Sequence, residues 1–127
     1  MFIENKSKLA FSETVTTLTG VIELKGWKVL ATHNLKETLD KHGYNVLPVV
    51  VFELCNPRFS SRMLAGDDER TMASMMPCRI AVYEKSDGST YISRMNAEMF
   101  AAMLGGLAAE VMTEAFRETE LMVAELV

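Results

Sequence analysis

The chain has 127 residues, of which 49% are hydrophobic, and its formal net charge is −4. This length suits one domain, and this hydrophobic content indicates a folded core rather than global disorder. The acidic balance argues against a general nucleic-acid-binding protein, which needs a basic face to neutralise phosphates. No apolar run reaches the roughly 20 residues of a membrane span. The N-terminus also lacks the apolar core of a signal peptide, so we expect a cytoplasmic protein.

The first third of the chain alternates between predicted strands and helices. Residues 7–11 are read as a short first strand, and residues 13–25 as an amphipathic helix that Ser12 caps. Residues 27–33 alternate between apolar and polar side chains, which is typical of a strand. Asn34 then caps a short helix, because Glu37 follows three residues later as in a capping box.

The central segment predicts a strand, a helix and a hairpin. Residues 49–52 are a continuous apolar run without alternation, which favours a central strand covered on both faces. Asn56 and Pro57 form a helix start, since Asn caps well and Pro suits the first helical position. Residues 67–76 fit either a further helical turn or an ordered loop. Two strands, at residues 79–84 and 89–95, then flank the Asp87-Gly88 turn signal.

From Asn96 onward the pattern predicts a helix of about 28 residues. Its apolar stripe comprises Phe100, Leu104, Leu107, Val111, Ala115, Met122 and Leu126. Gly105 and Gly106 interrupt this helix and mark a kink or a close contact. The stripe exceeds what one small sheet needs for cover, which favours a homodimer. The fold class is therefore α/β (α+β), with residues 1–127 as a single domain. We expect a mostly antiparallel sheet of about four to five strands, covered by helices, with a long C-terminal helix.

The only two cysteines stand at comparable strand ends. Cys55 precedes a helix N-terminus, where unpaired backbone N–H groups favour negative charge, and Cys78 opens the next strand. If these strands are adjacent and antiparallel, the two thiols become neighbours. One interpretation is that both cysteines are small buried residues that pack like hydrophobic ones. The other is a cysteine pair with thiol chemistry, such as a reversible disulfide, a sulfur carrier or a sensor.

Methionine is the compositional outlier, with ten residues. The simpler interpretation is adaptable core packing. The sharper one is a soft-metal site for Cu(I), since thioether and thiolate ligands suit this ion. Its weak candidate ligands are Met72, Met75, Met76 and Cys78. A zinc site is disfavoured because no C-x-x-C motif is present and neither His33 nor His42 accompanies a cysteine.

A candidate binding pocket lies at the helix start that follows the apolar strand. Its predicted members are Cys55, Asn56, Arg58, Cys78 and Arg79, and Arg62 lies nearby in the sequence. Two interpretations of these arginines stay open. In one they line an anion-binding site, and in the other they are ordinary surface residues. The acidic residues Asp67, Asp68 and Glu69 could bind a hard cation, but a solvated helix start is the simpler interpretation.

No catalytic pattern stands out: the sequence has neither a G-x-S-x-G elbow nor a glycine-rich phosphate loop. We therefore expect a small-molecule-binding domain that acts as a homodimer, rather than an enzyme, with no cofactor and no nucleic-acid partner. Thiol-based redox or sulfur handling by Cys55 and Cys78 is the alternative, and Cu(I) binding is a further one.

Two motifs resemble the bacterial and archaeal family called domain of unknown function 302. They are Leu54-Cys55-Asn56-Pro57 and Met76-Pro77-Cys78-Arg79, supported by Gly26-Trp27-Lys28-Val29, Val82-Tyr83-Glu84 and Asp87-Gly88. The resemblance covers nearly the whole chain. It implies an α/β domain with a mostly antiparallel sheet and homodimers, but no established activity and no catalytic residue. Many members have a proline before the last helix, where this chain reads Met95-Asn96-Ala97.

Overall fold

A five-stranded antiparallel sheet organises the computed structural model, which describes residues 1–127. The strands lie in the order β1-β5-β4-β3-β2, and each neighbouring pair runs antiparallel. Their bounds are β1 Phe2–Lys6, β2 Lys28–Asn34, β3 Val49–Cys55, β4 Cys78–Glu84 and β5 Thr90–Met95. This architecture confirms the predicted α+β fold class.

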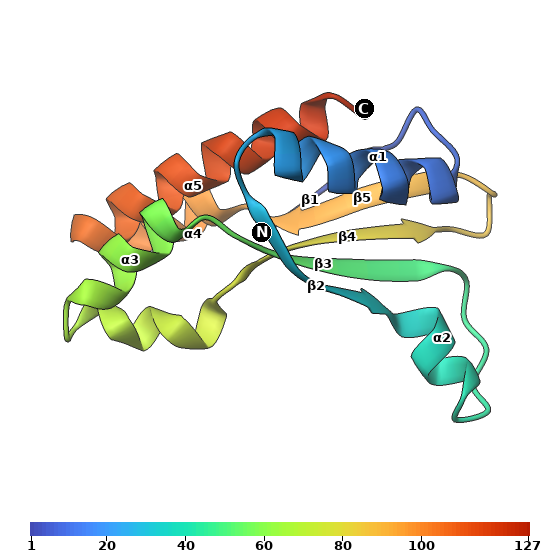
Figure 1. Cartoon of the computed structure of the whole chain (residues 1–127), viewed down its shortest axis with the longest axis horizontal. Coiled ribbons are helices and arrows are strands. Elements are labelled where there is room, and N and C mark those ends of the chain that lie inside the picture. Colours follow the sequence, from blue (N-terminus) through green and yellow to red (C-terminus); the bar gives the residue numbers. More distant parts are fainter.

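The helices are distributed unequally over the two faces of the sheet (Figure 1). Helices α1 (Phe11–Leu24) and α5 (Gly106–Ala124) lie across one face. Helices α3 (Pro57–Ala65) and α4 (Ala97–Leu104) and the 3₁₀ helix η1 (Glu69–Met75) gather at one end of the sheet. The short helix α2 (Leu35–Asp40) and its loop project from the other end. The second face is left without a helical layer, and below we call it the open face.

The core follows from strand alternation, because successive side chains point to opposite faces. Along β3, Val50, Phe52 and Leu54 are buried, whereas the residues between them are only half-buried. The prediction that this strand is covered on both faces is therefore wrong. Its continuous apolar run reflects β-branched residues on the open face as well, not a second layer of helices.

The N-terminal prediction was also wrong in position. The first strand is Phe2–Lys6, which pairs with β5, and not residues 7–11. Ser7 instead lies in the turn before α1, where its buried hydroxyl hydrogen-bonds that of Thr14 at 2.8 Å. Helix α1 begins at Phe11 with Ala10 at the cap position, so Ser12 lies within the helix. The strand was missed because Ile3 is its only apolar residue in the interior.

Asparagine caps begin three of the helices. The side chain of Asn34 accepts the N–H of Glu37 at 3.0 Å, as predicted. Asn56 accepts the N–H of Arg58 and precedes Pro57, also as predicted. Asn96 accepts the N–H of Met99 at 3.1 Å. An asparagine cap thus supplies the helix start at the position where many members of the family that the sequence resembles have proline.

The long C-terminal helix is present as α5, but the glycine pair separates it from α4. Gly105 and Gly106 have φ angles of 68° and 63°, which side chains with a Cβ rarely adopt. The chain therefore turns there, and the predicted stripe is divided. Val111, Ala115 and Met122 are buried against the rest of the chain, so this part of the stripe is used within the protomer.

The segment between α3 and β4 resolves the choice left open for residues 67–76. It forms η1, a 3₁₀ helix, which ends before Pro77. Strands β4 and β5 then make the predicted hairpin around Asp87 and Gly88. An irregularity of register between Val29 and Ala31 marks a bulge in the edge strand β2.

Candidate functional site

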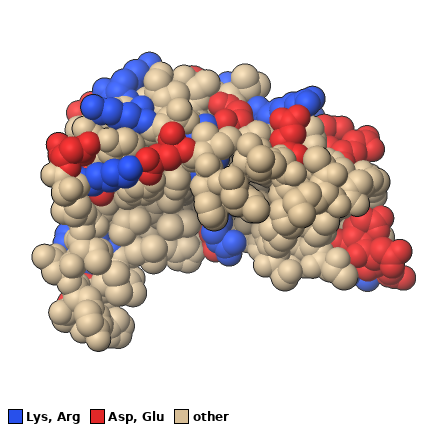
Figure 2. Space-filling view, turned by 180° about the vertical axis from the view of Figure 1, so that it is seen from behind, with Lys and Arg blue, Asp and Glu red and all other residues tan.

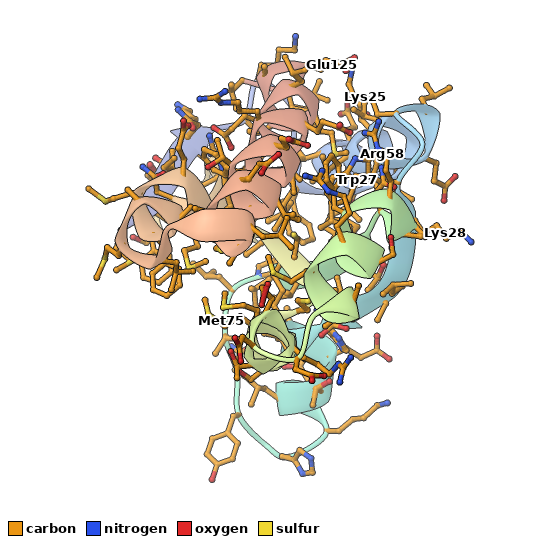
Figure 3. All side chains as sticks on the ribbon, turned by 90° about the vertical axis from the view of Figure 1, so that its left-hand side faces the viewer. Lys25, Trp27, Lys28, Arg58, Met75 and Glu125 are labelled. Carbon is orange, nitrogen blue, oxygen red and sulfur yellow. The ribbon has the colours of Figure 1, made fainter.

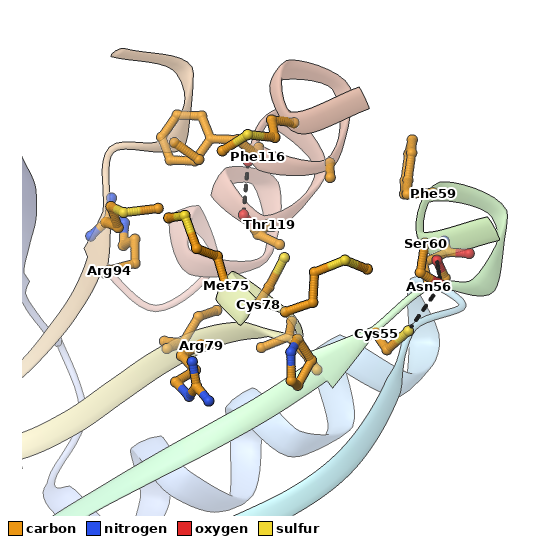
Figure 4. Close-up of a pocket in the computed structure, with 18 of the residues that line it drawn as sticks. Cys55, Asn56, Phe59, Ser60, Met75, Cys78, Arg79, Arg94, Phe116 and Thr119 are labelled. Atoms are coloured by element: carbon orange, nitrogen blue, oxygen red, sulfur yellow. Dashed lines mark hydrogen bonds between the residues drawn. The ribbon is translucent and has the colours of Figure 1, made fainter. Parts of the chain in front are cut away.

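A pocket of about 550 Å³ opens at the end of the sheet where α3, η1 and α5 meet (Figure 4). Twenty-seven residues line it, and 19 of them are hydrophobic. Small-molecule sites usually have volumes of about 300–1,000 Å³ and mostly apolar walls. The size and composition of this pocket therefore fit a small-molecule site.

Methionine is unusually frequent in the walls of the pocket. Six of the ten methionines line it: Met63, Met72, Met75, Met76, Met95 and Met112. They come from α3, η1, the segment before β4, β5 and α5. Methionine side chains are flexible and polarizable, so they adapt to ligands of different shape. The unusual methionine content thus concentrates at one place in the fold.

One corner of the pocket is built around the single tryptophan. Trp27 is 3% exposed, and its indole N–H donates to a carboxylate oxygen of Glu118 at 3.0 Å. The other oxygen of Glu118 accepts from Arg58, whose guanidinium lies 4.7 Å from the centre of the Phe59 ring. Trp27 and Arg58 lie together in Figure 3, well apart from Met75. The α5 carboxylate therefore ties α3 to the start of β2.

The two cysteines lie on adjacent antiparallel strands, as the thiol hypothesis required. Leu54 is opposite Cys78 in the register, so Cys55 lies one residue beyond. Both cysteines line the pocket, and both are free thiols, so the predicted pair is not a disulfide. Cys78 points into the pocket in Figure 4, whereas the sulfur of Cys55 lies 3.4 Å from the Ser60 hydroxyl. Their side chains are thus directed differently.

The surroundings of Cys78 favour its neutral thiol form. The residue keeps some exposed surface, but desolvation by its apolar surroundings raises the pKa of the thiol, and the nearby Cys55 raises it further. A thiolate is the nucleophilic and metal-binding form of cysteine. At neutral pH, Cys78 therefore behaves mainly as a soft, uncharged wall of the pocket.

The other predicted pocket residues are separated by the fold. Asn56 and Arg79 line the pocket, but Arg58 does not. Arg58 pairs with Glu118, and Arg62 with Glu110 and Glu114. Arg79 pairs with Glu53 at 3.3 Å.

The proposed soft-metal ligands Met72, Met75, Met76 and Cys78 all line the pocket. No group of three or more His, Cys, Asp or Glu side chains is arranged to hold a metal ion. His33 instead faces Glu53 at 3.4 Å on the open face.

Sequence reasoning missed the wall that α5 contributes. Its lining residues recur at helical spacing and are Val111, Met112, Ala115, Phe116 and Thr119. The stripe identified from the sequence contained only Val111 and Ala115. A second stripe, one residue further along, was the available signal, because a pocket wall widens the apolar face of a helix.

Comparisons with known proteins identify the family of this chain. A family model described as "Domain of unknown function DUF302" matches residues 3–126. The chain belongs to the DUF302 family. An uncharacterised conserved DUF302 protein from Bacillus stearothermophilus has a similar crystal structure, with a TM-score of 0.88 and 21% sequence identity. The alignment covers 99% of this chain and 98% of that one, and at this identity it shows the fold alone. No curated protein matches the sequence.

The surface of this DUF302 domain is charged unevenly. Figure 2 shows charged side chains gathered along its upper edge and at the right-hand end, with a broad uncharged area elsewhere. None of its helices combines the length and the apolar character of a membrane span.

Proposed function

We propose that the protein is a small-molecule-binding domain whose ligand occupies the methionine-rich pocket. The observation that carries this proposal is the 550 Å³ pocket with 19 hydrophobic residues among its 27 lining residues. An open apolar cavity of this size exposes surface that a ligand would remove from water. The adaptable methionine side chains favour a binding role over a role that requires fixed reacting groups.

The single tryptophan provides the test. Trp27 lines the pocket, so a bound fluorescent ligand lies within range of energy transfer from its indole. We expect the uncharged dye N-phenyl-1-naphthylamine to bind with saturation and to quench Trp27 emission. A titration without saturable energy transfer would contradict the proposal.

A matched pair of methionine variants locates the binding. Met75 lines the pocket, whereas the exposed Met103 on α4 does not. We expect Met75→Glu to weaken dye binding by about tenfold or more, because the new carboxylate must be desolvated by the dye. Met103→Glu adds the same charge and should bind the dye as the unmodified protein does. Equal affinities in the two variants would exclude this pocket as the dye site.

We propose further that the domain acts as a homodimer through the open face of the sheet. The original reason, the C-terminal stripe, is weakened because much of it is buried within the protomer. The open face is a better candidate: Val51, Ala81 and Ser93 lie side by side across β3, β4 and β5 and are half-buried, and all three also line the margin of the pocket. The ion pairs Arg79–Glu53 and Lys85–Glu4 flank this strip. The surface around it therefore carries both positive and negative charges, which is compatible with a self-complementary interface.

Sedimentation at micromolar concentration tests the dimer. We expect a dimer for the unmodified chain and for Ala102→Arg, since Ala102 is exposed on α4. Ala81→Arg should give monomers, because it places an unpaired cation at the centre of the strip. A monomeric unmodified chain would exclude the dimer and leave the pocket proposal intact.

Thiol chemistry is the second candidate, supported by the neighbouring positions of Cys55 and Cys78. In this case hydrogen peroxide would oxidise the two thiols to one disulfide and be reduced to two water molecules. The different side-chain directions and the raised pKa of Cys78 disfavour it. Mass spectrometry of peroxide-treated protein should show no loss of two hydrogen atoms from an internal disulfide, and its rapid formation would revive this candidate.

Cu(I) binding is the third candidate, because Met72, Met75, Met76 and Cys78 share one pocket. Cys78 must lose its proton to become a thiolate ligand, and its raised pKa opposes this step. Anaerobic loading followed by metal analysis tests it. Stoichiometric copper that Cys78→Ser abolishes would favour the metal over an organic ligand.

A further inference from the structure

We infer that the ligand of the pocket is an aromatic molecule that carries no anionic group such as a carboxylate or a phosphate. This inference rests on the proposed binding function and adds the chemical class of the ligand. It follows from which groups in the pocket wall are still free to interact. Three independent features of the wall support it.

The arginines that line the pocket are already neutralised by the protein. Arg94 is 8% exposed, and its guanidinium donates two hydrogen bonds of 2.7 Å to the two carboxylate oxygens of Glu120. Its remaining nitrogen donates to the side chain of Asn5, also at 2.7 Å. Arg79 pairs with Glu53 across β3 and β4. An anionic ligand would have to displace these carboxylates, which the fold itself holds in place.

The fully buried hydrogen-bonding groups of the wall are also occupied. Every buried side-chain nitrogen and oxygen atom in the chain has a hydrogen-bond partner within the protein. The hydroxyl of Thr119 donates to the backbone oxygen of Phe116, and the side chain of Asn56 caps α3. A site built for a polar ligand leaves donors or acceptors directed at it. This pocket has none that is buried and unused.

The remaining surface of the wall is apolar, and sulfur and aromatic carbon stand there beside aliphatic side chains such as Leu54 and Ile80. Six methionines and Cys78 contribute sulfur, and Trp27, Phe59 and Phe116 contribute rings. Sulfur atoms at the edge of an aromatic ring contribute about 0.3–1.5 kcal/mol in favourable contacts, so several of them together select rings over alkyl chains. The protonated state of Cys78 keeps this part of the wall uncharged.

Two dyes of nearly identical shape test the inference. N-phenyl-1-naphthylamine is uncharged, and 8-anilinonaphthalene-1-sulfonate is the same molecule with a sulfonate. We expect the uncharged dye to bind at least about tenfold more tightly, because the sulfonate loses hydration without gaining a free cation. Energy transfer from Trp27 shows that each dye binds the domain, and weaker binding to Met75→Glu but not to Met103→Glu locates the dye in the pocket.

Charge variants sharpen the comparison. Met75→Lys adds a cation to the wall, so it should shift the ratio of affinities towards the sulfonate. Met103→Lys adds the same cation outside the pocket and should leave the ratio unchanged. Replacing the uncharged dye with a straight-chain alcohol of similar size should lower the affinity if rings are preferred.

The outcomes separate the two proposals. If the sulfonate binds as tightly as the uncharged dye, or the alcohol binds as tightly as the ring, the inference is overturned and the binding function survives. If neither dye shows energy transfer from Trp27, both proposals are overturned. A tenfold preference for the uncharged dye that Met75→Lys reduces supports the inference.

Discussion

The two faces of the sheet are built from the same strands but differ in burial and polarity. On the helix-covered face, side chains such as Phe52, Ile80 and Ile92 are almost completely buried and pack under α1 and α5. On the open face, Glu4 accepts hydrogen bonds from Tyr83 and Lys85, and Asp87 accepts from Tyr91. Stability therefore depends mainly on the first face, whereas the second carries hydrogen bonds and ion pairs at the surface.

Phe52→Ala is expected to have the largest effect. Phe52 is completely buried, so its truncation should lower the free energy of unfolding by about 3–5 kcal/mol. Its neighbour Val51 points to the open face and is half-buried, so Val51→Ala should cost about 1 kcal/mol or less. Urea unfolding measures both. Similar losses would show that the open face is packed in solution as well.

Arg94 is the charged exception on the covered face, and its removal should have the next largest effect. Arg94→Met breaks the pair with Glu120, whose side chain is 29% exposed and so keeps part of its hydration. We expect a loss of about 2 kcal/mol in unfolding free energy. The double variant Arg94→Met with Glu120→Gln should lose less than the sum of the single variants. Additive losses would contradict direct coupling.

The reactivity of Cys78 tests whether its thiol is desolvated in the pocket wall. Since its pKa is raised, less thiolate is present at a given pH than in the unfolded chain. In a Cys55→Ser variant, alkylation by iodoacetamide should be slower in the native protein than in urea. Removing Cys55 takes away its charge but not the desolvation, which is the larger cause. The rate profile should also lie at higher pH, and coincident profiles would contradict the burial of this thiol.

Glu4 on the open face should give the smallest effect. Its hydrogen bonds from Lys85 and Tyr83 lower the pKa of Glu4 below the ordinary value of 4.5. The stabilisation it provides is therefore present above that value and is lost as the pH falls through the lower pKa of the folded state. Lys85→Met should raise the pKa of Glu4, as measured by NMR titration. Because Glu4 is on the surface, little change in overall stability is expected.

The sequence was most informative where one local rule acts alone. Asn56 before Pro57 and the turn at Asp87-Gly88 depend on backbone geometry within a few residues, and both predictions were confirmed. The apolar run at residues 49–52 was misread because a β-branched residue favours strands on exposed and buried faces alike. Whether helices cover a face is decided by residues distant in the sequence.

The pocket was predicted only in part for the same reason. Cys55 and Cys78 flank α3 and η1 in sequence, so their shared location followed from the assumption of antiparallel strands. The α5 wall, with Met112 and Phe116, joins them only through the tertiary fold. Trp27 is even less evident, because its partner Glu118 lies 91 residues away. Periodicity identifies an apolar face, but it does not say what stands opposite.

The bulge between Val29 and Ala31 bears on how copies of this domain meet. β2 is an edge strand, and a flat edge would invite another chain to extend the sheet by backbone pairing. The bulge interrupts the regular ladder there, and the opposite edge, β1, is only five residues long with charged side chains. Both features discourage edge-to-edge growth into fibrils.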